Sequence, residues 1–278
     1  MTEGEDLVLY EREPPIGRLV LNWPEKANAQ SSALVHLFDR YLGEIDRDYE
    51  IKVVIIKANG KGFSAGHVIA PGAYPEFAEG QAHIGTNWKA SADLFLWPTL
   101  RLWELSKPTI AQVHGYAIGG GTYFALVPDI TIASEDAYFQ MPLVQGLGFP
   151  GGETMIEPWL FMNWKRAAEY LYTAQTLSAE DALRAGLINR VVPRDELEAT
   201  VEQMAAHIAR APLSTLMATR ALLKRAWELM GMRLHLQMST DLMALCESTS
   251  DARALRQELA EARRLPRDQA AQGGSPPS

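Results

Sequence analysis

Two stretches of small residues are suited to binding an oxygen atom through the main chain. The segment HGYAIGGGTYFAL (114–126) carries three adjacent glycines, Gly119, Gly120 and Gly121, between two apolar runs. Glycine has no Cβ, so a ligand can approach its backbone closely. A helix beginning near Gly121 would add unpaired N–H groups and the positive end of its dipole. The stretch indicates either a site for an anion or a polarised carbonyl, or a tight turn that binds nothing.

The second stretch is GKGFSAGHVI (60–69), which directly follows a β-branched run and so forms another small-residue turn after a strand. Two such turns at the ends of parallel strands can face each other across a crevice. One N–H from each would form a two-donor oxyanion hole. A thioester oxygen gains negative charge when its α-carbon loses a proton or its carbonyl is attacked, and each donor lowers that barrier by ~3–4 kcal/mol. The spacing matches neither a dinucleotide fingerprint nor a Walker loop.

Alternating strands and helices must position these turns. We expect strands at 17–24, 51–60, 108–115 and 129–134, and helices at 31–46, 92–106 and 120–127. The apolar strands suit burial on both faces, and the helical spacing puts apolar residues on one face. This order predicts an α/β fold with parallel pairing.

The pattern changes after about residue 150. Here 176–187 predicts a helix with a capping-box-like start at Ser178, and 187–193 is the one strand expected. Residues 195–262 predict successive helices, with a break at Pro212. We therefore divide the chain into an α/β core (1–195), a C-terminal helical region (196–264) and a disordered tail (265–278).

Composition narrows the partners. The net charge of −8 argues against a nucleic-acid surface, which needs clustered Lys and Arg. Cys246 is the only cysteine, so no intrachain disulfide can form, and the acidic N-terminus has no apolar signal core. The uncharged stretch between Lys107 and Asp129 is interrupted by glycines, Gln112 and His114, so we interpret it as strand, loop and buried helix. These features predict a cytoplasmic protein that does not bind a membrane.

The two glycine turns, in the forms FSAGHVI (63–69) and HGYAIGGGTYFALVPDI (114–130), resemble the crotonase family, also called the enoyl-CoA hydratase/isomerase family. Further similar segments are PEKANAQ (24–30), SKPTIAQVHG (106–115), TLSAEDALRAGLINRVVP (176–193) and STSDAR (248–253). The similarity spans roughly residues 7–262. It implies a spiral of ββα units followed by a helical trimerisation region, in homotrimers or hexamers.

The resemblance also implies a site. The oxyanion donors would be the backbone N–H groups of His67 and Gly120, and the substrate an acyl-CoA thioester. Lys26, Ala65 and Val68 fall on the segments that meet coenzyme A, with Lys26 near its phosphates. It implies no metal and no tightly bound cofactor, because coenzyme A is part of the substrate.

The resemblance fails at the catalytic acids. The two glutamates with which family hydratases add water correspond here to Tyr123 and Leu143, and the usual aspartate of the first turn to Val68. A phenol with a pKa of about 10 is a poor base at neutral pH, and leucine moves no proton. Hydration by the two-glutamate route is therefore disfavoured unless other groups replace these acids.

Several titratable groups are candidates for that replacement. Glu153 is expected at a helix start, where the helix dipole alone also explains it. Glu76, Glu79 and His83 lie in the segment 70–90, which we expect to be a loop with surface charges. The His67 imidazole is expected to point away; if it points inward, it is the best titratable group beside the thioester.

Other notable side chains have structural interpretations. We expect His114 to be a structural hydrogen-bonder and Asp129 a structural acid at a strand start. Trp88, Trp97 and Trp103 are core residues unless one of them lines an acyl pocket, in which case a bulky or cyclic acyl group is expected.

Two functions remain open at this point. One is an acyl-CoA enzyme performing hydration, double-bond isomerisation, C–C cleavage or thioester hydrolysis. The other is a catalytically silent acyl-CoA-binding protein of the same fold, because the loss of both acids beside an intact hole would have this appearance.

Overall fold

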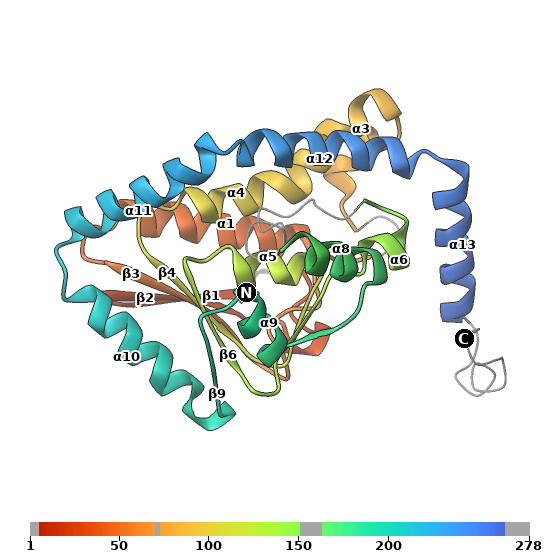
Figure 1. The fold of residues 1–278 in the computed structure, drawn as a ribbon. Coiled ribbons are helices and arrows are strands. Elements are labelled where there is room, and N and C mark those ends of the chain that lie inside the picture. Colours follow the sequence, from red (N-terminus) through yellow and green to blue (C-terminus); the bar gives the residue numbers. More distant parts are fainter. Residues whose placement is uncertain (1–5, 70–72, 151–162, 265–278) are drawn as a thin grey trace.

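The computed structural model describes residues 6–69, 73–150 and 163–264, and within these a six-stranded sheet forms the centre of the protein (Figure 1). Its order is β1 (Val8–Glu13), β2 (Ile16–Leu21), β3 (Val53–Ala58), β4 (Thr109–Val113), β6 (Ile130–Ser134) and β9 (Arg190–Val192). β1 is antiparallel to β2, and every later neighbour pairs in parallel. The α/β fold with parallel pairing predicted from the sequence is confirmed.

A smaller sheet holds β5 (Tyr116–Ile118), β7 (Tyr138–Gln140) and β8 (Leu177–Ser178). Sequence reasoning missed these strands because two or three residues are too few to show a period. It also missed β1, whose sequence VLYERE is half charged and largely exposed because the strand lies at the edge of the main sheet.

Helices surround both sheets. They are α1 (Ser32–Arg47), α2 (Ala78–Gln81), α3 (Ile84–Ser91), α4 (Trp97–Glu104), α5 (Gly120–Leu126), α6 (Leu143–Leu147), α8 (Trp164–Thr173), α9 (Ala179–Ala185), α10 (Leu197–Ala209), α11 (Leu213–Leu229), α12 (Met232–Glu247) and α13 (Ser250–Arg264). Short turns are η1 (Pro24–Lys26), η2 (Pro75–Phe77), the π turn η3 (Ala92–Leu96) and η4 (Arg194–Glu196). Within the described residues, no helix is long and apolar enough to cross a membrane.

One expectation about local structure was wrong. The segment 70–90, expected as a loop, is mostly helical where it is described, forming η2, α2 and α3. Its few buried residues, Asn87 and Ala90, give too narrow an apolar face to produce a readable helical period.

The main core lies between the central sheet and the helices α1, α4 and α5. α1 begins after Ser31, whose side chain accepts a hydrogen bond from the N–H of Leu34, and it buries the apolar face that its spacing predicts. Its Phe38 stacks on Phe124 of α5 at a ring-centroid distance of 4.3 Å. This contact packs α1 against α5, the helix that begins at Gly120, the second of the three glycines.

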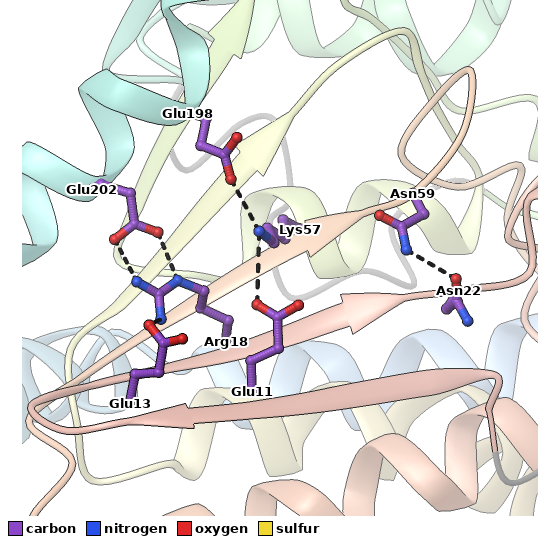
Figure 2. Close-up of polar contacts among 8 residues, drawn as sticks. All are labelled: Glu11, Glu13, Arg18, Asn22, Lys57, Asn59, Glu198 and Glu202. Carbon is purple, nitrogen blue, oxygen red and sulfur yellow. Dashed lines mark hydrogen bonds and ion pairs between the residues drawn. The ribbon is translucent and has the colours of Figure 1, made fainter.

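α10 covers the opposite face of the sheet. Its Leu197 and Val201 pack on Ile55, Ile110 and Ile132 in a second apolar cluster. Figure 2 shows the ion pairs that border this contact. Arg18 of β2 donates two hydrogen bonds of 2.6 and 2.7 Å to Glu202, and Lys57 of β3 lies 3.2 Å from Glu198.

Among the contacts of the C-terminal helices in the described residues is an ion pair between a buried arginine and a partly exposed aspartate. α10 ends at Ala209 and α11 begins after Pro212, as predicted. From α11, Arg220 reaches inward with a side chain only 3% exposed and places its Nε 2.7 Å from a carboxylate oxygen of Asp129. The same oxygen accepts from the N–H and the hydroxyl of Thr109. The interpretation of Asp129 as a structural acid at a strand start is confirmed.

Candidate active site

The two glycine turns lie side by side, the first after β3 and the second after β5. The N–H groups of Phe63 and Ser64 both donate to the carbonyl of Tyr116 at 3.0 Å. The N–H of Ile118 donates back to the carbonyl of Ser64, also at 3.0 Å. Segments more than fifty residues apart in sequence therefore run as neighbours, as the sequence analysis required.

Gly66 and Gly120 bring the two turns into contact. Gly66 has a φ of +84°, and a Cβ at this position would stand 2.9 Å from the backbone nitrogen of Gly120 and 2.4 Å from the carbonyl oxygen of Ile118. A Cβ on Gly120 would in turn stand 2.5 Å from Cδ2 of the His67 ring. No side chain fits either place, so the turns can approach each other only through glycine.

Two N–H groups at this contact are uncommitted. Within the part of the chain that the structure describes, neither the N–H of His67 nor that of Gly120 donates a hydrogen bond. The flanking N–H groups are used: that of Gly119 bonds the carbonyl of Gln140 at 2.9 Å, and that of Val68 bonds the carbonyl of Gln30 at 3.1 Å. These two groups are the ones that the sequence analysis named as candidate oxyanion donors.

Gln30 joins the two turns, a role that sequence reasoning missed. Its side chain is buried and donates to the carbonyl of Gly120 at 2.9 Å, while its backbone N–H donates to the carbonyl of Gly66 at 2.8 Å. The Tyr74 hydroxyl donates to the Gln30 carbonyl at 2.6 Å and accepts from the N–H of Val68. A buried amide within PEKANAQ was the available signal, because a buried polar group must find partners.

Asn28 joins the early loop (residues 24–30) to the first glycine turn (residues 60–69). This fully buried residue donates to the carbonyls of Asn59 and Gly62 and accepts from the N–H of Trp23. The N–H of Ala65 donates to the carbonyl of Ala27 at 3.0 Å. The structure therefore brings the exposed Lys26, at the end of η1, and the exposed Ala65 onto neighbouring segments.

The His67 ring is turned inward, contrary to the expectation that it points away. Its ring centroid lies 4.6 Å from that of Phe95 on η3, 6.0 Å from that of Tyr123 and 6.4 Å from that of Tyr74. Both ring nitrogens are buried and without a hydrogen-bond partner among the described residues. Burial lowers the pKa of His67 from 6.5 to about 3, so the imidazole is neutral at physiological pH.

This neutral imidazole makes stability depend on pH. A native pKa below the unfolded value near 6.5 means that His67 costs no stability above pH 6.5 and lowers the free energy of unfolding as pH falls. Between pH 8 and pH 5, we expect the free energy of unfolding of the natural protein to fall by about 2 kcal/mol more than that of a His67→Phe variant. Urea unfolding of both proteins at the two pH values measures this difference, since all other groups are shared. Equal losses would contradict it.

Tyr123 and Leu143, which the sequence analysis matched to the family glutamates, are both buried. Tyr123 on α5 is 4% exposed and faces the His67 ring, and Leu143 at the start of α6 is 8% exposed in the main core. The helix α6 lies in the segment 139–153. Leu143 is an apolar core residue.

The other acid candidates are not gathered at the turns. Glu153 lies outside the described residues. Glu76 is exposed and accepts a hydrogen bond from Ser32, while Glu79 and His83 are exposed near the ends of α2 and α3. His114 is buried and places its Nε2 3.0 Å from the carbonyl oxygen of Gly60, so its expected structural role is confirmed.

The three tryptophans do not contact the His67 ring. Trp88 and Trp97 are 46% and 37% exposed, and Trp103 packs on the main core and hydrogen-bonds Glu228. Phe95 is the aromatic residue of this region that faces the turns. Within the described residues, no group of three or more His, Cys, Asp or Glu side chains could hold a metal ion.

Comparisons with known proteins identify the family to which this chain belongs. The sequence profile of the enoyl-CoA hydratase/isomerase family matches residues 11–266. The chain belongs to this family. A short-chain-enoyl-CoA hydratase of Clostridium acetobutylicum is 34% identical over 220 residues, covering 77% of this chain and 80% of that protein. A probable enoyl-CoA hydratase of Mycobacterium tuberculosis is 32% identical over 213 residues, covering 74% and 79%.

Solved structures of the enoyl-CoA hydratase/isomerase family share the fold. A probable enoyl-CoA hydratase from Mycobacterium smegmatis has 33% identity and a TM-score of 0.78, covering 86% of this chain and 93% of that one. One from Mycobacterium thermoresistibile has 29% identity and a TM-score of 0.80, covering 90% and 99%. The protein thus has the crotonase fold, and membership makes it an acyl-CoA-processing enzyme of the hydratase/isomerase type.

Proposed function

We propose that this enzyme binds the thioester oxygen of an acyl-CoA between the N–H groups of His67 and Gly120 and stabilises the enolate that forms there. The observation that carries the proposal is the contact between the two glycine turns, at which the N–H groups of His67 and Gly120 donate no hydrogen bond among the described residues. Donors already fixed in place need no reorganisation when charge develops, so each contributes ~3–4 kcal/mol to lowering the barrier. Coenzyme A is part of the substrate.

The coenzyme A end is assigned to the early loop. Lys26 is exposed and lies on a loop that Asn28 ties to the first turn, so its ammonium can approach a phosphate while the thioester reaches the turns. Ala65 and Val68 flank the first turn and complete this binding surface. The exposed position of Lys26 makes its interaction with phosphate sensitive to salt.

The same oxyanion site serves four reactions: hydration, double-bond isomerisation and C–C cleavage place negative charge on the thioester oxygen as an enolate, and thioester hydrolysis does so as a tetrahedral intermediate. The buried Leu143 argues against the two-glutamate route, and Tyr123 can orient a ligand through its hydroxyl. Glu153 remains the candidate acid outside the described residues. A Glu153→Gln variant assayed with a panel of enoyl-CoA thioesters tests that role.

The alternative is an acyl-CoA-binding protein without catalysis. The buried residues at both glutamate positions favour it, because they remove the groups that activate water. Isothermal titration with acyl-CoA thioesters, together with turnover assays on the same panel, separates the two functions. Turnover of any thioester supports the enzyme; tight binding with no turnover of any member supports the binder.

The protein is also proposed to form trimers, or hexamers built from trimers. Large apolar side chains are exposed along α11 and α12: Leu222, Leu223, Leu229, Met230, Leu234, Met238, Leu242 and Leu245. An apolar surface of this kind on a water-soluble chain marks an interface. These residues belong to the C-terminal helical region (196–264) that we propose for assembly.

Light scattering is expected to give a native mass of about three or six times the 30.8 kDa chain. Replacing both Leu229 and Leu234 with lysine should shift the mass towards one chain, because charges on an apolar interface cannot be solvated once it closes. Tyr49→Lys, at a side chain 74% exposed and outside α11 and α12 in sequence, is the control that should keep the native mass. A monomeric natural protein would contradict the assembly.

A further inference from the structure

The second proposed donor, the N–H of Gly120, belongs to a peptide unit whose carbonyl is hydrogen-bonded by a side-chain hydroxyl. This peptide joins Gly119 to Gly120, so its carbonyl oxygen is that of Gly119. The oxygen accepts from the N–H of Thr122 at 2.9 Å and from the Thr122 hydroxyl at 2.7 Å. Thr122 lies in the first turn of α5 and is only 3% exposed, so little solvent competes for the hydroxyl bond.

The Gly119–Gly120 peptide is flanked by residues that allow it to turn over. Neither residue has a Cβ to restrict rotation about the bonds on either side of the peptide. Gly119 has a φ of +51°, and no heavy atom beyond its chain neighbours lies within 4 Å of the place a Cβ would take. A half turn would present the Gly119 carbonyl oxygen to the thioester oxygen in place of the Gly120 N–H. The two oxygens would then repel each other.

The first proposed donor is held in the same way, but by the main chain. The N–H of His67 shares a peptide with the carbonyl of Gly66, which accepts from the N–H of Gln30 at 2.8 Å. A carbonyl that accepts a hydrogen bond polarises its peptide and strengthens the N–H of that peptide as a donor, by about 10–30% per bond. Each proposed donor therefore has the carbonyl of its own peptide occupied. Thr122 supplies the bond that comes from a side chain and can be removed by substitution.

We propose that the hydroxyl of Thr122 is a positioning group for the oxyanion hole, an inference that rests on the proposed function. A trans peptide directs its C=O and N–H to opposite sides. By holding the Gly119 carbonyl, the hydroxyl keeps the Gly120 N–H turned to the thioester oxygen and strengthens it as a donor. Threonine hydroxyls often bond a carbonyl in the preceding helical turn. Thr122 differs because the carbonyl it bonds lies on the donor's own peptide.

Thr131 of β6 offers a matched control. Its hydroxyl also donates at 2.7 Å to a carbonyl of α5, that of Ala125, and the residue is 2% exposed. Thr122→Val and Thr131→Val therefore each remove one buried hydroxyl bond to the same helix with little change of shape. Only the first of these bonds lies on a donor peptide. Thr122→Ser keeps the hydroxyl and tests for rescue.

The first measurement is infrared difference spectroscopy of bound hexanoyl-CoA that carries ¹³C at its thioester carbonyl. Hydrogen bonds from the two N–H groups should lower the C=O stretching frequency relative to that of the free thioester. In Thr122→Val, we expect this downshift to shrink by at least about a fifth, because the Gly120 N–H loses the strengthening that the hydroxyl bond gives. Thr122→Ser and Thr131→Val should keep the natural downshift. Binding alone produces this signal, so the measurement does not depend on turnover.

Kinetics on each thioester that the natural protein turns over give the second measurement. Thr122→Val should lower kcat about 3- to 10-fold, the factor that corresponds to one neutral hydrogen bond. Its KM should stay within about twofold, since the lost stabilisation is greatest once the oxygen is charged. Thr122→Ser and Thr131→Val should keep kcat within about twofold. Urea unfolding should show similar losses of stability in the two valine variants, because each removes one buried hydroxyl bond.

The outcomes distinguish this inference from the proposed function. A Thr122→Val protein with the natural downshift overturns the positioning role. An equal decline in Thr122→Ser or in Thr131→Val also overturns it, because altered shape or stability would then explain the effect. If Gly120→Ala abolishes the downshift while Thr122→Val keeps it, the oxyanion hole stands and only the role of Thr122 falls. A natural protein that does not lower the carbonyl frequency of hexanoyl-CoA overturns both.

Discussion

Replacing Gly120 with alanine is expected to lower kcat/KM for acyl-CoA turnover by about 100- to 1000-fold, the effect of losing one oxyanion donor. The new Cβ would stand 2.4 Å from Oε1 of Gln30 and 2.5 Å from Cδ2 of His67. Neither neighbour can move freely: the Gln30 amide is bonded to the Gly120 carbonyl, and the His67 ring is packed against Phe95. The turns must therefore separate, and the two N–H groups no longer meet at one oxygen.

A second glycine gives the control for this substitution. Gly85 of α3 has no heavy atom within 4 Å of the place a Cβ would take, so Gly85→Ala should leave turnover unchanged. The Gly120→Ala variant should remain folded, with a free energy of unfolding lower by about 1–3 kcal/mol because of overpacking. Steady-state kinetics and urea unfolding on the same preparations measure both effects. Unchanged kinetics in a folded Gly120→Ala protein would refute the oxyanion hole.

Replacing Asp129 with alanine is expected to lower the free energy of unfolding by about 2–3 kcal/mol, because Arg220 is 3% exposed while the Asp129 side chain is 24% exposed. One carboxylate oxygen of Asp129 accepts from Thr109 and from Arg220, so its loss leaves the guanidinium of Arg220 buried without its counter-ion. The remaining bonds of Arg220, to the carbonyls of Trp103 and Leu105, do not neutralise its charge. Loss of the ion pair between Arg220 and Asp129 should therefore weaken the attachment of α11 to the sheet.

An exposed ion pair of nearly the same length is the control. Arg101 lies 2.8 Å from Asp39, but these side chains are 50% and 44% exposed. Asp39→Ala should therefore change the free energy of unfolding by no more than about 1 kcal/mol. Urea denaturation at one fixed protein concentration compares the two variants, since assembly also contributes to stability. Similar losses of unfolding free energy in both variants would show that burial of the Arg220 guanidinium has no special weight.

The sequence predicted the parts of this protein that follow from local composition. The β-branched run of β3, the apolar face of α1 and the glycine turns each produce a readable pattern. The orientation of the His67 ring could not be predicted, because it depends on Phe95, twenty-eight residues further along the chain, and on the space left by Gly120. The role of Gln30 depends likewise on two distant carbonyls. Side-chain environments assembled from remote segments leave no periodic trace.

The π turn η3 has a consequence for how this site can diverge. Its wider turn carries Phe95 against the His67 ring and is followed at once by α4. A chain lacking one residue here would continue as a regular α-helix, and the residues before the deletion would rotate by about 100° relative to α4. A single-residue insertion or deletion within 92–96 would therefore place a side chain other than Phe95 against the imidazole of His67. The two glycine turns would keep their geometry.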